Sequence, residues 1–397
     1  MLPLMVPSKA PKWTSFREPA FVRLLLANLL VITGSTCFVM LPAILEDQGL
    51  RRWHIGLGDA AFWMASVLIQ PWLAGVLDRF PKQFFYLPGC LGMSLAAAGY
   101  IWAPFQPLPV WCLRGLQGTG FALYVTATLA WLGERVPGAG MGRFLGIFGL
   151  TGMLGGLLGS GLSEFVWLTY GRRPLFFCAA VILLVGWVWL LTLPDLEPER
   201  PQLRATDSWS GPGAARLALA AWAFGLAVGS LFAFTTPFLR SLGVTGISGL
   251  FAGLFLMSAA ARVGCGYWLD LWGPLGLVAP SLALLAVGAL LMAVLPGLSG
   301  ARVAGFLLSG ACSGVGYGAI YPALKAQAYQ SFPSENRGAA LSLVKMAIDL
   351  GCASGSLLAG FLASWLGYPV TFTILGLLVF LLSMVVARLN SRMLTAP

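Results

Sequence analysis

The chain has 397 residues, of which 58% are hydrophobic and 10% are charged, and its formal net charge is +10. So much apolar surface cannot be buried inside a water-soluble domain, which excludes a soluble globule. The positive charge needs no nucleic-acid partner, because basic residues beside membrane-spanning helices are drawn to the membrane surface.

Apolar stretches of about 20 residues, the length that a helix needs to cross a ~30 Å hydrocarbon core, recur along the whole chain. Eight stretches hold one span each: 24–45, 60–77, 115–133, 144–163, 174–194, 217–239, 241–261 and 303–324. Three longer stretches, at 83–113, 271–301 and 350–387, each hold one crossing and part of another. The sequence therefore predicts an all-α membrane protein with twelve transmembrane helices.

A long polar stretch near the middle of the chain divides these helices into two sets of six. We expect a six-helix bundle over 1–193, a cytoplasmic linker over 194–213 and a second six-helix bundle over 214–397. The two sets also match each other in sequence, at offsets of 192 and 196 residues: Asp78 with Asp270, Gly118 with Gly314, and Gly120 with Gly316. Such matches are typical of two parallel halves related by an axis along the membrane normal.

The orientation follows from the distribution of basic residues. With both termini in the cytoplasm, cytoplasmic segments hold fourteen Lys and Arg, and the opposite loops hold six: Arg51, Arg52, Arg172, Arg173, Arg240 and Arg302. This asymmetry obeys the positive-inside rule. We therefore expect a multi-pass protein of the inner (plasma) membrane that contacts lipids and has both termini in the cytoplasm.

Four motifs carry a family resemblance. They are "AGVLDRFPKQ" at 74–83, "RGLQGTGFA" at 114–122, "GYWLDLWG" at 266–273 and "YPALKAQAYQSFPSENRGAALSLVKMAIDLG" at 321–351. Together they resemble the major facilitator superfamily over essentially the whole chain, and the last resembles bacterial efflux-type members of the drug:proton antiporter kind. The resemblance implies two pseudo-symmetric six-helix bundles that give alternating access to a site between them.

The match has two departures. Gly75 lies three residues before Asp78, whereas Gly266 lies four residues before Asp270. The helix over 144–163 is rich in glycine but lacks the proline of the family's antiporter signature, which weakens the assignment as an antiporter.

The acids at the two apolar helix ends, Asp78 and Asp270, are predicted to be conformational latches. In this fold each would face the N-terminus of a helix in the other half, near Gly338 and Gly142 respectively, where unpaired N–H groups favour a carboxylate. Arg79, Arg143 and Arg337 would add charge-assisted hydrogen bonds and hold the cytoplasmic side shut. The alternative is an interfacial acid that only ends a helix.

Asp349 is the best candidate for a proton site. It lies twelve residues beyond Arg337, ~18 Å along a helix and close to the middle of the bilayer. Lys345 lies one turn earlier on the same face, and Arg262 lies ~12 Å into the helix that ends at Asp270. Arg114 begins the motif at 114–122, for which the resemblance suggests a role in proton coupling or in balancing the charge of the substrate. The alternative is a permanently paired structural cluster.

Other polar side chains are candidates for the wall of a substrate cavity, although helix packing explains each one equally well. They are Asn28, Gln70, Tyr124, Tyr317 and Tyr321. Asp59 and Glu164 are expected to be wetted residues at the membrane boundary, and Lys325 is expected to extend to the cytoplasmic surface.

The function predicted from these residues is proton-coupled export of a small organic molecule. Arg114, Arg262 and Lys345 outnumber Asp349 in the expected cavity, which favours an anionic or zwitterionic substrate. The alternatives are a proton symporter or uniporter that imports a small metabolite, and a transport-inactive receptor or lipid-interacting protein on the same fold. No nucleotide loop, metal-ligand cluster or nucleophile motif is found, so we expect no enzyme activity, cofactor or metal. One chain is sufficient for the mechanism, and we expect a monomer.

Overall fold

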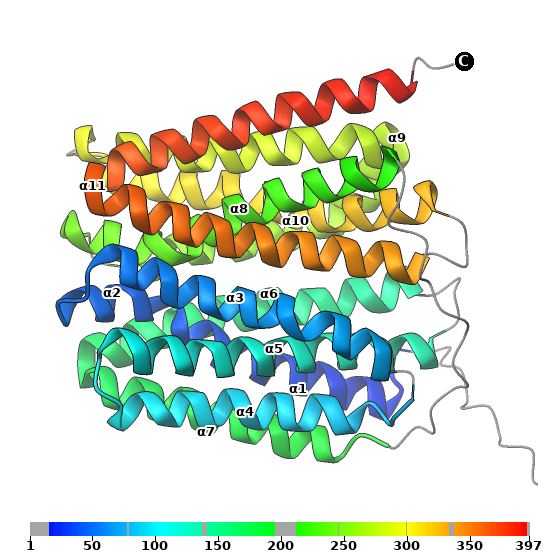
Figure 1. Ribbon diagram of the computed structural model, residues 1–397, viewed down its shortest axis with the longest axis horizontal. Coiled ribbons are helices and arrows are strands. Elements are labelled where there is room, and N and C mark those ends of the chain that lie inside the picture. The colour runs from blue at the N-terminus through cyan, green and yellow to red at the C-terminus, as the bar shows by residue number, and fades with distance from the viewer. Residues whose placement is uncertain are drawn as a thin grey trace, which may run out of the picture.

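The computed structural model describes residues 16–77, 79–136, 141–194, 212–244, 246–298, 300–332 and 337–394. Over these ranges the chain forms helices and short connections, with no strand. The helices lie side by side along the long axis of the molecule (Figure 1).

The first six spans come from seven helices. The first span is broken: α1 (Pro19–Thr36) passes through a 3₁₀ turn (Cys37–Met40) into the short α2 (Leu41–Asp47). The next five are α3 (Arg52–Val76), α4 (Gln83–Trp102), α5 (Pro107–Arg135), α6 (Met141–Tyr170) and α7 (Arg172–Leu191).

The last six spans come from four helices, because α9 and α11 each contain two. The elements are α8 (Pro212–Ser241), α9 (Ser248–Val294), the 3₁₀ turn η2 (Leu295–Gly297), α10 (Arg302–Ser331) and α11 (Arg337–Leu394). Within α9, Gly273 has φ 67°, and within α11, Gly367 has φ 77°. A glycine in this left-handed region ends a helix, and a proline follows each within two residues. The described residues therefore hold twelve spans, which confirms the predicted architecture.

Eight of the helical stretches are long and apolar enough to cross a membrane by composition alone. The long helices α3 and α5 fall outside that set, and they carry Asp59 and Arg114. Composition alone therefore does not identify these two helices as membrane spans.

The two sets of helices occupy separate halves of the molecule, α1–α7 in the lower part of Figure 1 and α8–α11 in the upper part. The same close contacts recur in both halves. A Cβ atom on Gly118 would lie 1.9 Å from the carbonyl oxygen of Phe62, and one on Gly314 would lie 2.4 Å from that of Leu254. Gly120 and Gly316 form a second matched pair. A Cβ atom on either one would lie 2.5 Å from a carbonyl oxygen, that of Gly89 or that of Ser281 respectively. The sequence repeat is therefore also a repeat of helix packing.

The halves meet along two antiparallel helix pairs, and each pair has a constant register. Between α3 and α11, Arg52 contacts Ala363, and Ser66 contacts Asp349. The residue numbers in each of these pairs add to 415. Between α6 and α9, Gly149 lies against Arg262 and Gly156 lies against Phe255, and these numbers add to 411.

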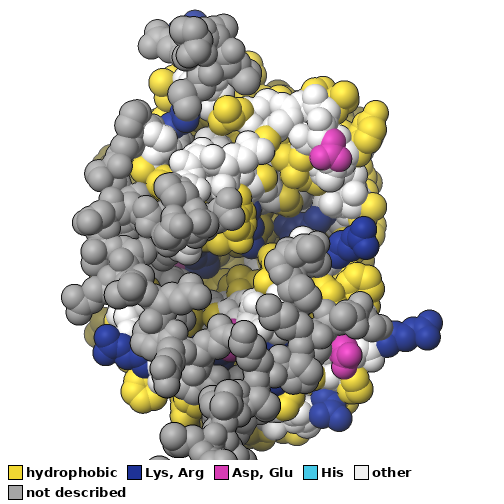
Figure 2. Space-filling model, turned by 90° about the vertical axis from the view of Figure 1, so that its right-hand side faces the viewer, with side chains coloured by type: hydrophobic (Ala, Val, Ile, Leu, Met, Phe, Trp, Pro, Cys, Tyr) yellow, Lys and Arg dark blue, Asp and Glu magenta, His cyan; other side chains and the backbone are white. Residues whose placement is uncertain are grey.

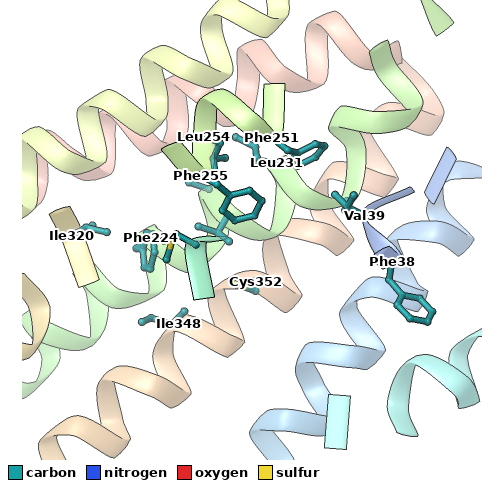
Figure 3. Packing of buried hydrophobic residues seen from close by; sticks show 14 of the residues in the cluster. Phe38, Val39, Phe224, Leu231, Phe251, Leu254, Phe255, Ile320, Ile348 and Cys352 are labelled. Atoms are coloured by element: carbon teal, nitrogen blue, oxygen red, sulfur yellow. The ribbon is translucent and has the colours of Figure 1, made fainter. Parts of the chain in front are cut away.

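The apolar core of the second half reaches the interface between the halves. Figure 3 shows Phe251 and Phe255 of α9 together with Leu231 of α8, and Ile348 and Cys352 of α11 close by. A Cβ on Gly156 of α6 would lie 2.5 Å from the ring of Phe255. The glycine therefore leaves the space that this ring occupies between the halves.

Candidate functional site

The first buried charge cluster lies between α3 and α11. Asp349 is 1% exposed and forms an ion pair with Lys345, one turn earlier on α11. Ser66 of α3 donates a hydrogen bond of 2.6 Å to the same carboxylate, and Lys345 Nζ lies 3.4 Å from the Ser66 hydroxyl. The proposed proton site and its cation are thus brought together, with a serine from the opposite half.

A second buried cluster lies two turns away on the same two helices. Asp59 of α3 forms an ion pair with Arg114 of α5, and Arg114 also donates to the Gln117 side chain at 3.1 Å. Ser356 of α11 donates to the second Asp59 oxygen at 2.8 Å. Asp59 is only 6% exposed. The expectation of a wetted boundary residue was wrong, because α2 covers this part of α3.

The end of the molecule that carries α2 is closed by contacts between the halves. Tyr368 of α11 donates a 2.5 Å hydrogen bond to Glu46, whose other oxygen pairs with Arg52 at 2.8 Å. Arg240 of α8 pairs with Asp47 at 2.8 Å. Both acids belong to α2, so this short helix is tied to the second half at two points.

Glu164 adds a third tie at the same end. Its two carboxylate oxygens accept hydrogen bonds of 2.7 Å from the backbone N–H groups of Ile247 and Ser248, where α9 begins. A carboxylate at a helix N-terminus stabilises unpaired N–H groups. The expectation of a wetted boundary residue was wrong here too, since Glu164 is 6% exposed and bonds across the halves.

The opposite end of the molecule is open between the halves. Asp270, Arg79 and Arg143 are exposed there and make no ion pair with any described residue. Cβ atoms on Gly142 and Gly338 would meet nothing within 4 Å. Figure 2 shows this end hollowed near its centre, with Lys and Arg side chains in the hollow. Asp78 and the Arg337 side chain lie outside the described residues, and their latch contacts remain predictions.

Three of the predicted cavity residues are bonded within the first half. Tyr124 donates to the Asn28 side chain at 3.0 Å, and Asn28 in turn donates to Thr151 at 2.8 Å. Gln70 donates to Thr126 at 3.2 Å. In this conformation these side chains hold α1, α3, α5 and α6 together.

The remaining cavity candidates gather in the second half. Arg262 lies against Gly149 of α6, and its buried Nε has no hydrogen-bond partner among the described residues. Lys325 is half-buried and lies over the Tyr321 ring, 4.5 Å from its centroid. Tyr317 packs against the rings of Phe224 and Phe232. Arg262 is therefore a cation that faces the interface and forms no ion pair with a carboxylate of the described residues.

Several of the residues that join the halves could not be recognised from the sequence. Ser66 and Ser356 are ordinary serines in apolar helices, and only their spacing of seven residues from Asp59 and Asp349 relates them to the acids. Of the glycines on α6, Gly149 and Gly156 face the other half, whereas Gly155 and Gly159 pack against α1.

Comparisons with known proteins agree with this architecture. The Major Facilitator Superfamily profile matches residues 24–301 and 217–393. The uncharacterized MFS-type transporter YhhS of Escherichia coli (strain K12) is 27% identical over 371 residues, covering 89% of this chain and 88% of its own. The multidrug resistance protein MdtG of Rahnella sp. (strain Y9602) is 25% identical over 400 residues, covering 94% and 93%.

A solved structure shows the same fold. The crystal structure of a POT family transporter in complex with a thioalcohol-conjugated peptide superposes with a TM-score of 0.79 and 14% sequence identity, covering 98% of this chain and 99% of that one. The family match spans nearly the whole chain, and its helices are those of a multi-pass inner-membrane protein. The chain belongs to the major facilitator superfamily, and it is a membrane transporter rather than an enzyme.

Proposed function

We propose that the protein exports a small organic anion or zwitterion in exchange for protons, by alternating access of its two halves. The observation that carries the proposal is Asp349, a buried carboxylate whose hydrogen bond to Ser66 crosses from one half to the other. With both termini in the cytoplasm, the closed end at α2 is the outer side and the structure is inward-open.

Protonation of Asp349 would change the contact between the halves. The carboxylate now attracts Lys345 and accepts a bond from Ser66. A proton removes that charge and turns one oxygen into a donor, so Lys345 loses its counter-charge. A ligand shifts a conformational equilibrium by its differential affinity for the two states, and loss of the Ser66 contact when the halves move would give a proton on Asp349 such a difference. Asp349 is therefore placed to couple protons to the movement of the halves.

The charges around the central region favour an anionic group on the substrate. Arg114 and Lys345 are neutralised by Asp59 and Asp349, so the excess positive charge comes from Arg262. Lys325, over Tyr321, adds a second cation from the same half. Both side chains are half-buried, and a bound anion would supply the counter-charge that neither has among the described residues.

The latch proposal for Asp270 is supported by the register between α6 and α9. Continued along these helices, a sum of 411 would bring Asp270 level with Met141, where it would meet the first residues of α6 when the hollow end closes. The latch would then belong to the outward-open state.

The relative named as a multidrug resistance protein supports export of organic molecules. The test uses purified protein in liposomes that enclose a pH-sensitive dye, with organic anions and amphiphilic cations screened for substrate-evoked proton flux. We expect flux with wild type, and with Asp349→Asn a fall to the level of protein-free liposomes. Exchange of labelled for unlabelled substrate needs no net proton movement, so it should persist in the variant and shows that the variant is folded.

The direction of proton movement separates the alternatives. Protons that move against the substrate indicate an exchanger, and protons that move with it indicate a symporter. Substrate movement without protons indicates a uniporter, and binding without movement of any solute indicates a receptor. Equal proton flux in wild type and Asp349→Asn would contradict the role of Asp349.

The same liposomes test the role of Arg262 in selectivity. Arg262→Gln is expected to raise the half-saturating concentration of an anionic substrate by about tenfold or more, because a hydrogen bond to a charged group contributes about 1.5–3 kcal/mol. A neutral substrate should be unaffected. Arg262→Lys keeps the charge and is the matched control. An equal loss for neutral and anionic substrates would assign Arg262 to packing against Gly149 instead.

A further inference from the structure

We propose that Asp59 is a second proton-binding site, reached from the outer side beneath α2, so that two protons move in each cycle. This inference rests on the proposed proton coupling and adds to it a residue that the sequence placed at the membrane boundary.

The surroundings of the two acids are reciprocal. Asp59 pairs with a cation of its own half, Arg114, and accepts a hydrogen bond from Ser356 of the other half. Asp349 likewise pairs with a cation of its own half and accepts from a serine of the other half. A proton on Asp59 would therefore change an ion pair within one half and a hydrogen bond between the halves, as a proton on Asp349 would.

A small cavity lies between Asp59 and α2. It measures about 10 Å³, close to the minimum space for one water molecule. Asp59 and Arg114 line it together with Leu41, Pro42 and Leu45 of α2. The ties of Glu46 and Asp47 hold α2 in place, so their release would expose this cavity to outer water.

The groups that face Asp59 define the proton step. Arg114 from α5 is its charged neighbour, Ser356 is its polar neighbour from α11, and α2 contributes apolar side chains. Arg52 and Glu46 lie two turns farther out and pair with each other. A proton from outer water would bind the free electron pair of the Asp59 carboxylate, and the same proton would return to water on the cytoplasmic side. No other bond changes.

The depths of the two acids set their order. Asp59 and Asp349 are level with Ser356 and Ser66 on the partner helices, seven residues or ~10 Å apart along the axis. Asp59 lies on the side of α2, and Asp349 lies nearer the hollow end. A proton that enters from outside therefore meets Asp59 first.

Infrared difference spectroscopy of the purified protein tests the proposal without any substrate. The carboxylic acid C=O band reports the protonated form of a buried acid during a pH titration. We expect one band to disappear in Asp59→Asn, a different band to disappear in Asp349→Asn, and both to remain in Glu164→Gln, which removes a buried carboxylate elsewhere. Ser356→Ala should shift only the Asp59 band, and Ser66→Ala only the Asp349 band.

A folding defect must be separated from loss of a proton site, because Asp59→Asn leaves Arg114 buried without its counter-charge. The double variant Asp59→Asn with Arg114→Gln removes both charges, and it should lack the same band. Asp59→Glu should retain a band at a shifted position. If Asp59→Asn unfolds, the double variant and Asp59→Glu still test whether the band belongs to Asp59.

The outcomes distinguish this inference from the proposed function. If Asp59→Asn leaves the spectrum unchanged while Asp349→Asn removes a band, Asp59 does not titrate and the second site is wrong, whereas coupling at Asp349 stands. If neither variant changes the spectrum, both proposals fail. Once a substrate has been found by proton flux, reversal potentials should give two protons per substrate in wild type, and a ratio of one would overturn the second site.

Discussion

Gly118→Ala is expected to give a transporter that is strongly destabilised or does not accumulate in folded form. A Cβ at this position would lie 1.9 Å from the carbonyl oxygen and 2.6 Å from the carbonyl carbon of Phe62. These are backbone atoms of α3, so no side-chain rotation relieves the overlap. Overpacking of a core costs typically about 1–3 kcal/mol, and a forced separation of two helix backbones belongs at or above the upper end. Thermal unfolding followed by size-exclusion chromatography measures the loss.

Gly115→Ala is the matched control, one turn earlier on α5. A Cβ on Gly115 meets nothing within 4 Å, and alanine is favoured over glycine inside a helix by about 1 kcal/mol. This variant should be as stable as wild type or more stable. Gly314→Ala, the repeat of Gly118 in the second half, should resemble Gly118→Ala. Equal stability of the Gly118 and Gly115 variants would mean that α3 and α5 do not approach as closely as described.

The number of spans could be predicted from the sequence because hydropathy over about 20 residues responds directly to the thickness of the membrane. The internal breaks were also visible: the stretch 350–387 divides at Gly367, where glycine takes a positive φ and a proline follows. The matched glycines at an offset of 196 were visible as well. The reason for these glycines is that helix backbones approach closely in both halves, and only the structure shows this.

The two acids at the expected membrane boundary show where sequence reasoning fails. Hydropathy started the second span at residue 60, which left Asp59 outside it, but α3 begins at Arg52. Arg52 is stabilised at that depth by Glu46 and by the ring of Tyr368, 4.0 Å from its guanidinium carbon. These partners are 6 and 316 residues away in sequence. No local pattern reports such pairing, so the length of α3 and the burial of Asp59 could not be foreseen.

The sequence predicted most residues of the candidate site but not the net charge that remains after they pair. Lys345 and Asp349 share a helix face at a spacing of four, so their pairing follows from helix geometry. Arg114 carries no excess charge in the structure, because Asp59, which hydropathy leaves outside the second span, pairs with it. The excess positive charge therefore depends on Arg262, whose position against Gly149 comes from the register between the halves.

Cross-linking of either end of the transporter is expected to abolish transport completely and reversibly. Asp47→Cys with Arg240→Cys places thiols at an ion pair that joins the halves at the outer end. Gly142→Cys with Leu269→Cys places thiols on α6 and α9 at the register of 411, at the hollow end. A short bifunctional methanethiosulfonate reagent should link the outer pair readily in the present conformation. A reducing agent should restore transport.

The background for this experiment must lack reactive native thiols. The described chain holds seven free cysteines, of which Cys112 is exposed and Cys178 and Cys312 are half-buried, so these three are replaced by serine or alanine. Each single-cysteine variant treated with the same reagent is the control for modification without a link. Transport by the single variants should continue at the rate of the untreated protein.

The two links should exclude each other if the halves alternate. The hollow end can close only when the ties of α2 at the outer end are released, so a protein already linked at Asp47→Cys/Arg240→Cys should not be linked at Gly142→Cys/Leu269→Cys. In the unlinked protein, substrate and acidic pH should raise the yield at the hollow end, because they populate the outward-open state. Simultaneous linkage of both pairs in one molecule would contradict alternating access. If the yield of the link at the hollow end does not change with substrate or pH, closure of that end does not depend on protonation of Asp349.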